Sequence, residues 1–189
     1  VYATDAELAE LATAGYPLAT FDQRRLAKDS GYSAKLSGKE DPASIKRLEK
    51  FAAVFLIEEE GALDKIILPV HGYGLWSTLY GFIALQGDAE TIAGLGFYSH
   101  TETPGLGGEV DNPSWKALWV GKKIHDASGS IAIDVIKGHV IAGSKKEANQ
   151  VDGLSGATLT SKGVSNLVRF WLGEKGFAGF LNGIKGQGV

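Results

Sequence analysis

The feature that most constrains the fold is a series of short apolar segments separated by turn residues. Four such segments follow one another, residues 51–57, 66–70, 79–85 and 91–100, with charged or glycine-containing turns between them. Short apolar segments joined in this way are typical of β-hairpins. Since consecutive hairpins place neighbouring strands side by side, the pattern predicts an α+β fold built on a largely antiparallel, twisted sheet with flanking helices.

Helical patterns flank these segments. The clearest is an apolar stripe at helical spacing near the end of the chain, made by Val164, Leu167, Val168, Trp171 and Leu172. Shorter helices are expected over residues 1–12, over 112–119, where Asn112 can cap and Pro113 can open the helix, and over 177–184. One more strand is expected over residues 131–137, whereas residues 13–45 indicate a mostly irregular segment with room for one short helix.

Composition excludes several classes of protein. The chain has no cysteine, which removes disulfides, thiolate metal sites and cysteine nucleophiles. Its four histidines lack the spacing of a metal site, and no nucleophile elbow is present. A net charge of −3 argues against nucleic-acid binding. Residue 1 is valine, so we expect a processed form or an excised fragment. No apolar run approaches the ~20 residues of a membrane span, so a membrane anchor, if one existed, has been removed.

The stretch VDGLSGATLTSKGV, residues 151–164, places small and hydroxylated residues directly before the best helix. Thr160 or Ser161 is expected to cap this helix. A helix N-terminus also offers unpaired N–H groups to a phosphate, and Gly156 and Ala157 would let such a group approach the backbone. The stretch is not a P-loop. From the residues alone, a capped helix start and a phosphate site both remain open.

Two further stretches carry candidate residues. In SHTETPGLGGEVDNP, residues 99–113, His100 and Glu102 lie beside a stiff glycine- and proline-rich loop. In HGYGLWSTLYGF, residues 71–82, Trp76 lies between glycine-rich turns and could form the wall of a pocket for a flat aromatic ligand. A solvated surface loop and an ordinary core tryptophan are the alternative interpretations.

Taken together and in this order, the three stretches resemble the C subunit of the bacterial sodium-translocating NADH:quinone oxidoreductase. A more distant similarity extends to the G subunit of the Rnf complex and other FMN-binding domains. The blocks LPVHGYGLWSTLYGFIAL, GLGFYSHTETPGLGGEVDNPSW, GKKI, IDVIKG and VDGLSGATLTSKGV carry the resemblance, over roughly residues 50–185. We therefore expect a lead-in over residues 1–49, following the removed anchor, and an FMN-binding domain over residues 50–189.

The resemblance implies a covalent flavin. In that family FMN is joined by a phosphoester to the last threonine of Asp-Gly-x-Ser-Gly-Ala-Thr, which is Thr158 here. A separate flavin transferase reads this motif and installs FMN from FAD. The family also implies one N-terminal membrane helix, a location on the periplasmic side of the inner membrane, and contacts with other subunits of the complex (B, D and E).

The expected cofactor-binding residues come from the three stretches. They are Trp76, Ser77, Glu102, Thr103, Gly105, Leu106, Asp152, Ser155, Gly156, Ala157, Thr158, Leu159 and Thr160. The resemblance implies a relay of single electrons between neighbouring subunits toward quinone, in a subunit that is not catalytic alone and holds no metal. Lys145 and Lys146 could tune the flavin because they precede the motif. The alternatives are a G-subunit-like flavoprotein, a non-redox docking module and a noncovalent NADH-dependent flavin reductase.

Overall fold

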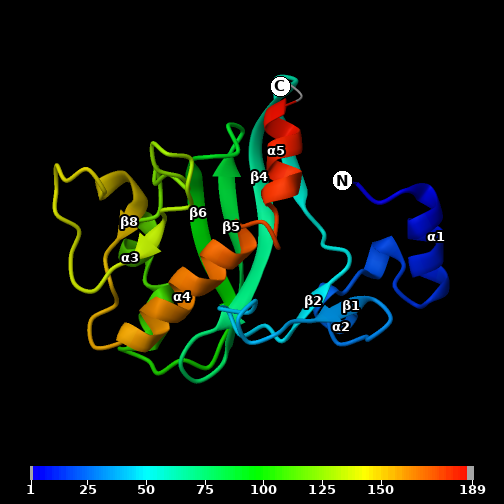
Figure 1. Cartoon of the computed structure of the whole chain (residues 1–189), viewed down its shortest axis with the longest axis horizontal. Helices are drawn as coiled ribbons and strands as arrows, with labels where there is room; N and C mark the ends of the chain where they lie inside the picture. Colours follow the sequence, from blue (N-terminus) through cyan, green and yellow to red (C-terminus); the bar gives the residue numbers. More distant parts are fainter. Residues whose placement is uncertain (1, 187–189) are drawn as a thin grey trace.

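The predicted antiparallel sheet is confirmed. In a computed structural model of the chain, which describes residues 2–186, four strands lie side by side in chain order: β3 (Phe55–Glu59), β4 (Ala62–Tyr73), β5 (Thr78–Gln86) and β6 (Ile92–Ser99). Each strand is antiparallel to the next, and β4 and β5 pair along nearly their whole length. The sheet is therefore a meander of three consecutive connections (Figure 1).

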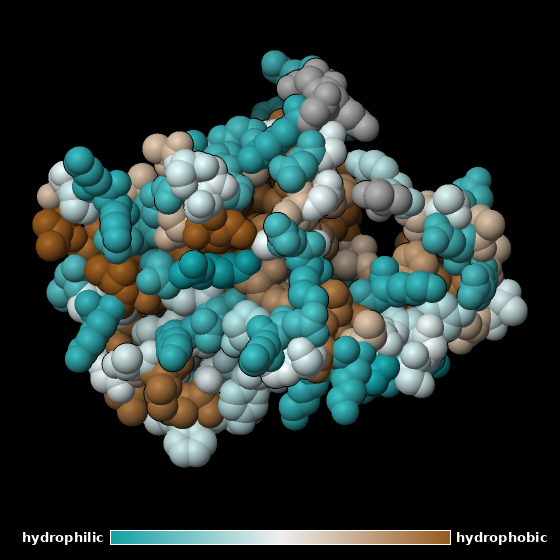
Figure 2. Space-filling model, in the orientation of Figure 1, coloured by the Kyte–Doolittle hydropathy of each residue, from teal (hydrophilic) through white to brown (hydrophobic). Residues whose placement is uncertain are grey.

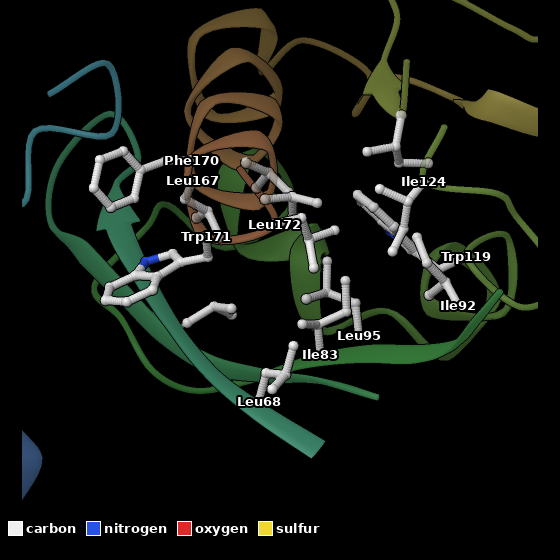
Figure 3. Packing of buried hydrophobic residues seen from close by; sticks show 14 of the residues in the cluster. Leu68, Ile83, Ile92, Leu95, Trp119, Ile124, Leu167, Phe170, Trp171 and Leu172 are labelled. Carbon is white, nitrogen blue, oxygen red and sulfur yellow. The ribbon is translucent and has the colours of Figure 1, made fainter. Parts of the chain in front are cut away.

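One face of the sheet is covered by α4 (Thr158–Trp171), the helix with the clearest apolar stripe. Alternate residues of β4, such as Leu68, point to this face, and Ile83 and Leu95 of the neighbouring strands lie beside it. Figure 3 shows these side chains under Leu167 of the helix and under Leu172, the residue that follows it. Burial of such leucine and isoleucine side chains contributes about 1.5–3 kcal/mol each, which makes this layer the main core of the domain.

Shorter elements surround this core. A turn of 3₁₀ helix, η2 (Gly107–Asp111), leads into α3 (Pro113–Ala117), and α5 (Ala178–Gly186) follows α4. Asn112 caps α3 as expected, since its Oδ1 accepts the backbone N–H of Ser114 at 2.9 Å. The expected helix over residues 177–184 is confirmed as α5, and Figure 1 shows α4 and α5 on the same side of the sheet.

The expected strand over residues 131–137 is largely wrong. Only β7 (Asp134–Val135) is extended, and it pairs in parallel with β8 (Gln150–Val151), which follows the 3₁₀ turn η3 (Glu147–Asn149), away from the main sheet. The backbone groups of this segment bond elsewhere: Val135 N–H donates to Ser165 Oγ of α4 at 2.7 Å. The apolar alternation at Ile133 and Val135 reflects burial under α4 rather than membership of the sheet.

The N-terminal segment forms a second, small apolar cluster beside the sheet. It contains α1 (Asp5–Thr13), η1 (Leu18–Thr20), α2 (Gln23–Leu26) and a hairpin of β1 (Ser33–Lys35) and β2 (Arg47–Glu49). The helix expected over residues 1–12 is thus confirmed, although residue 1 lies outside the described residues, as do residues 187–189. A hollow of about 500 Å³ separates this segment from α5, and hydrophobic residues gather around it in Figure 2.

Within residues 2–186, none of the helices has both the length and the apolar character needed to span a bilayer.

Candidate functional site

Glu102 joins the three stretches that sequence analysis singled out. Its Oε1 accepts three backbone N–H groups of the β4–β5 loop, from Leu75 (3.1 Å), Trp76 (2.9 Å) and Ser77 (3.2 Å). Its Oε2 accepts the hydroxyl of Thr160 in α4 at 2.7 Å. One carboxylate therefore fixes residues 74–77 and the start of α4 to the loop that follows β6.

Glycines make this close approach possible. A Cβ at Gly74 would lie 2.7 Å from Glu102 Oε1, and one at Gly107 would lie 2.6 Å from both Glu102 Oε2 and Thr160 Oγ1. Real Cβ atoms essentially never lie within 3.0 Å of such atoms, so a side chain at either position would displace the hydrogen-bonded carboxylate. The two glycines therefore allow the loops to close around the carboxylate, which leaves Glu102 only 5% exposed.

The same contacts keep Glu102 ionised. Burial raises the pKa of this carboxyl, but the hydrogen bonds from Thr160 and from the backbone of Trp76, Ser77 and Leu75 outweigh burial and lower the pKa below its usual value. Because all these partners donate hydrogen bonds, the carboxylate is satisfied as an anion. Glu102 and Thr160 were both expected to bind the cofactor, but both side chains are buried.

The start of α4 differs from the expectation in one respect. The predicted cap by Thr160 or Ser161 is wrong, because the helix begins at Thr158 and its N-cap is Ala157, which has no capping side chain. Thr160 is fully buried on Glu102, and Ser161 Oγ accepts the N–H of Leu154 at 2.9 Å. A fourteen-residue helix therefore begins without a side-chain cap, at the end where its dipole is positive.

Thr158 and Leu159 are exposed at this uncapped end. Two further apolar side chains from the other stretches, Trp76 and Leu106, are also exposed. Gly156, at φ +71°, brings two of the stretches together, because a Cβ there would lie 2.9 Å from Leu106 Cδ2. Thr158 is thus exposed at the start of the helix, as Ser155 is just before it, whereas the hydroxyls of Thr160 and Ser161 form internal hydrogen bonds.

Asp152, the first residue of the motif, faces the loop before β8 rather than the helix. Its carboxylate accepts the N–H of Val140 at 2.8 Å and lies 2.7 Å from His139 Nδ1. Its backbone carbonyl accepts the indole N–H of Trp115 at 2.9 Å. Asp152 thereby fixes the chain that leads to Ser155 and Thr158.

The remaining expected residues lie on the loops around Glu102. Ser77 Oγ accepts the N–H of Thr101 at 2.8 Å, and Thr103 O accepts the N–H groups of Leu106 and Gly108. Gly105 is exposed at φ +74°, a conformation that glycine adopts without strain. Ser155 is exposed, and Ala157 is buried beneath the start of α4. The structure therefore gathers all three stretches at one end of the domain.

A cleft that sequence reasoning missed opens beside Thr158. It has a volume of about 730 Å³ between α4 and the segment 134–139, and Lys137, Lys162 and Arg169 contribute to its lining. None of these three cations takes part in an ion pair in the described part of the chain. Lys162 follows Thr158 by one helical turn, a spacing that could have indicated it. Lys145 and Lys146 do not line this cleft.

Comparison with known families defines the class of protein. Residues 74–173 match the FMN-binding domain family, and this range includes the stretches 99–113 and 151–164 and most of the stretch 71–82. The domain is thus a flavin-binding one, of the fold described above.

Individual relatives narrow this class. The chain is 61% identical over 165 residues to the Na(+)-translocating NADH-quinone reductase C subunit of Pseudomonas aeruginosa, covering 87% of this chain and 63% of that protein. It is 47% identical to that of Vibrio parahaemolyticus, covering 97% and 69%. The crystal structure of Shewanella oneidensis NqrC superposes with a TM-score of 0.81 at 39% identity, covering 88% of this chain and 75% of that one. This chain belongs to the family of Na(+)-translocating NADH-quinone reductase C subunits, and it spans about two-thirds of the length of these curated relatives.

Proposed function

We propose that this domain relays single electrons through an FMN attached covalently to Thr158, as a subunit of a sodium-translocating NADH:quinone reductase. The observation that carries the proposal is the exposed Thr158 hydroxyl at an uncapped helix N-terminus, with Thr160 and Ser161 turned inward. A phosphoester at this oxygen would lie against the unpaired N–H groups and the positive end of the dipole, both of which stabilise a phosphate.

The residues around Thr158 also suit the flat ring and the negative charge of an FMN group. When bound, FMN supplies redox chemistry that amino-acid side chains lack. Trp76, Leu106 and Leu159 offer exposed apolar surface on three different segments, which is suited to a flat ring. Lys137, Lys162 and Arg169 add positive charge in the neighbouring cleft, which favours an anionic group.

Glu102 and Thr160 act as positioning residues in this proposal. They hold the Trp76 loop and the first turn of α4 at a fixed separation, and their burial keeps them from the surface that a flavin would contact. Ser77, Thr103, Gly105, Ser155, Gly156 and Ala157 shape the backbone around this surface. Asp152 orients the motif for the flavin transferase that would load FMN from FAD.

The location and partners follow from the family. We place the domain on the periplasmic side of the bacterial inner membrane, held there by an N-terminal membrane helix outside residues 1–189. Residues 1–49 form the lead-in, and residues 50–189 form the FMN-binding domain. Electrons would pass between this domain and other subunits, among them B, D and E, on the way to ubiquinone, so the domain alone turns over no substrate.

The test is co-expression of the domain with the flavin transferase, followed by intact-mass analysis and fluorescence of the denatured band. Wild type should carry one FMN, and Thr158→Val should carry none while remaining folded. Thr160→Ser, which keeps the hydroxyl that Glu102 requires, is the matched control and should load fully. Retention of flavin by Thr158→Val would refute the assignment.

A further inference from the structure

The face of the sheet opposite α4 bears aromatic side chains that no other element covers completely. Phe55 on β3, Phe82 on β5 and Tyr98 on β6 are all exposed. Phe82 contacts both of the others: its ring centroid lies 6.3 Å from that of Phe55 and 5.6 Å from that of Tyr98. A contiguous apolar patch of this kind marks an interaction site more often than scattered exposed residues do.

Part of the N-terminal segment borders this face and forms a hollow of about 600 Å³ with it. We call it the outer-face hollow; its aromatic floor is Phe55, Tyr80, Phe82 and Tyr98, and its basic rim is Arg24, Lys28, Lys46 and Arg47. The guanidinium of Arg24 lies 3.7 Å above the centroid of the Tyr80 ring. On β6, Gly96 pairs with Phe82 and Gly94 pairs with Ala84, and both glycines have open space where a side chain would lie, so the sheet face next to the hollow is flat backbone there.

The charge of the hollow differs in sign from that of the chain. Four cations line it against two carboxylates, Asp22 and Glu49, whereas the whole chain has a net charge of −3. Arg24, Lys28 and Lys46 are exposed, and within the described residues none of them forms an ion pair. Such a rim attracts and orients a negatively charged partner.

The rim is also held in a fixed shape. Ser44 and Lys46 adopt positive φ angles of 54° and 69°, which are unfavourable for residues other than glycine. The buried carboxylate of Asp41 stabilises this conformation by accepting the N–H groups of Ile45 (2.8 Å) and Lys46 (2.7 Å). Backbone strain that the surroundings maintain in this way is characteristic of binding sites.

The edge of the sheet favours a protein as the occupant. β3 is an edge strand with all five residues exposed, so it can pair with a strand of another chain beside the aromatic floor. A flat membrane surface would contact the rim without filling the hollow. The hollow also ends near the proposed flavin surface, since the Tyr73 hydroxyl donates to Trp76 O at 3.1 Å.

We propose that the outer-face hollow is the docking site for another subunit of the same complex, which inserts an apolar segment flanked by carboxylates. This inference rests on the proposed function, because it assumes that the domain works within the complex. A partner seated there would lie against the loop that carries Trp76, and so close to Thr158 for electron transfer.

The test uses the full-length subunit expressed with the other subunits and the flavin transferase, with the purification tag on another subunit. Arg24→Glu with Lys28→Glu should lower the recovery of this subunit by about tenfold, because like charges then face each other. Lys145→Glu with Lys146→Glu makes the same change of charge outside the hollow and should leave recovery unchanged. Tyr98→Asp and Val120→Asp form a second pair, because both residues are 58% exposed and only Tyr98 lines the hollow.

Covalent flavin in each variant, read from gel fluorescence, shows that the domain has folded, and it separates the two proposals. Loss of recovery in the hollow variants with flavin retained supports the docking site. Wild-type recovery in both hollow variants, or equal loss in the controls, overturns it. Two other results would also overturn the docking site, if the hollow variants leave assembly of the complex unchanged. One is sedimentation showing that the hollow mediates self-association. The other is flotation showing that the hollow binds anionic lipid vesicles. Absence of flavin in the wild type would instead refute the proposed function.

Discussion

Replacement of Glu102 by glutamine tests whether one carboxylate holds the site together. The change keeps the size of the side chain and removes its charge. Glu102 accepts four hydrogen bonds, three from the β4–β5 loop and one from Thr160. A glutamine oxygen can still accept the three backbone bonds, but its amide must then donate to the Thr160 hydroxyl.

The magnitude follows from these four bonds. A hydrogen bond to a charged group contributes about 1.5–3 kcal/mol and a neutral one about 0.5–1.5 kcal/mol, so each bond loses about 1 kcal/mol. Part of this loss is recovered, because a neutral amide costs less to bury than a carboxylate. We expect Glu102→Gln to lower the free energy of unfolding by about 2 kcal/mol at neutral pH.

The assay is urea unfolding of the domain, followed by tryptophan fluorescence at several pH values. The pKa of Glu102 is lowered in the folded state, so its ionised form stabilises the fold above the unfolded pKa, and this stabilisation is lost as the pH falls through the folded pKa. The difference between wild type and Glu102→Gln should therefore shrink in acid. Glu58→Gln, an exposed carboxylate on the edge strand, is the control and should unfold like wild type.

Two results would refute this reasoning. One is a midpoint for Glu102→Gln equal to that of wild type at neutral pH. The other is a difference between the two proteins that stays constant down to about pH 3, well below the ordinary glutamate pKa.

Three other variants test neighbouring features. Thr160→Val should lower the free energy of unfolding by about 1–3 kcal/mol, because Glu102 Oε2 loses its donor, and Thr160→Ser should restore it in the same urea assay. Gly156→Ala should cost about 1–3 kcal/mol in thermal unfolding and reduce flavin loading, since φ is +71° and the new methyl group meets Leu106. Burial, then the nearby charge of Arg24, lowers the pKa of His71 to about 4, so wild type should lose up to about 3 kcal/mol as the pH falls from 6.5 to 4. His71→Gln should flatten that part of the stability profile, and an unchanged slope would contradict the shift.

Much of the fold could be predicted from local patterns. The hairpin segments became β3 to β6 because each combined an apolar face with turn residues, and α4 was visible from its apolar stripe. The segment 131–137 could not be placed, because alternation at Ile133 and Val135 shows only that one side is buried. Whether a backbone joins the main sheet depends on distant partners such as Ser165, which no local pattern reveals.

The site was predicted only in part, because local patterns reveal a contiguous motif but not contacts between distant residues. The motif around Thr158 is contiguous in the sequence, so its position before a helix could be recognised directly. The roles of Glu102 and Thr160 depend on a contact between residues 58 positions apart, and a Ser/Thr-rich helix start suggested capping instead. The cations of the cleft come from α4, which carries Lys162 and Arg169, and from the segment of Lys137, which lies 21 residues before Thr158. That these two segments face each other depends on the fold, so the sequence alone did not reveal the cleft, and Lys145 and Lys146 lie outside it.

The central claim is that Thr158, and no other hydroxyl, carries the flavin. Cleavage after Lys146 and Lys162 releases residues 147–162, a peptide that holds Ser155, Thr158, Thr160 and Ser161 together. Fragmentation of this peptide by mass spectrometry, after loading by the transferase, should place one FMN phosphoester on Thr158. An unmodified peptide, or a flavin on any of the other three hydroxyls, would contradict the account.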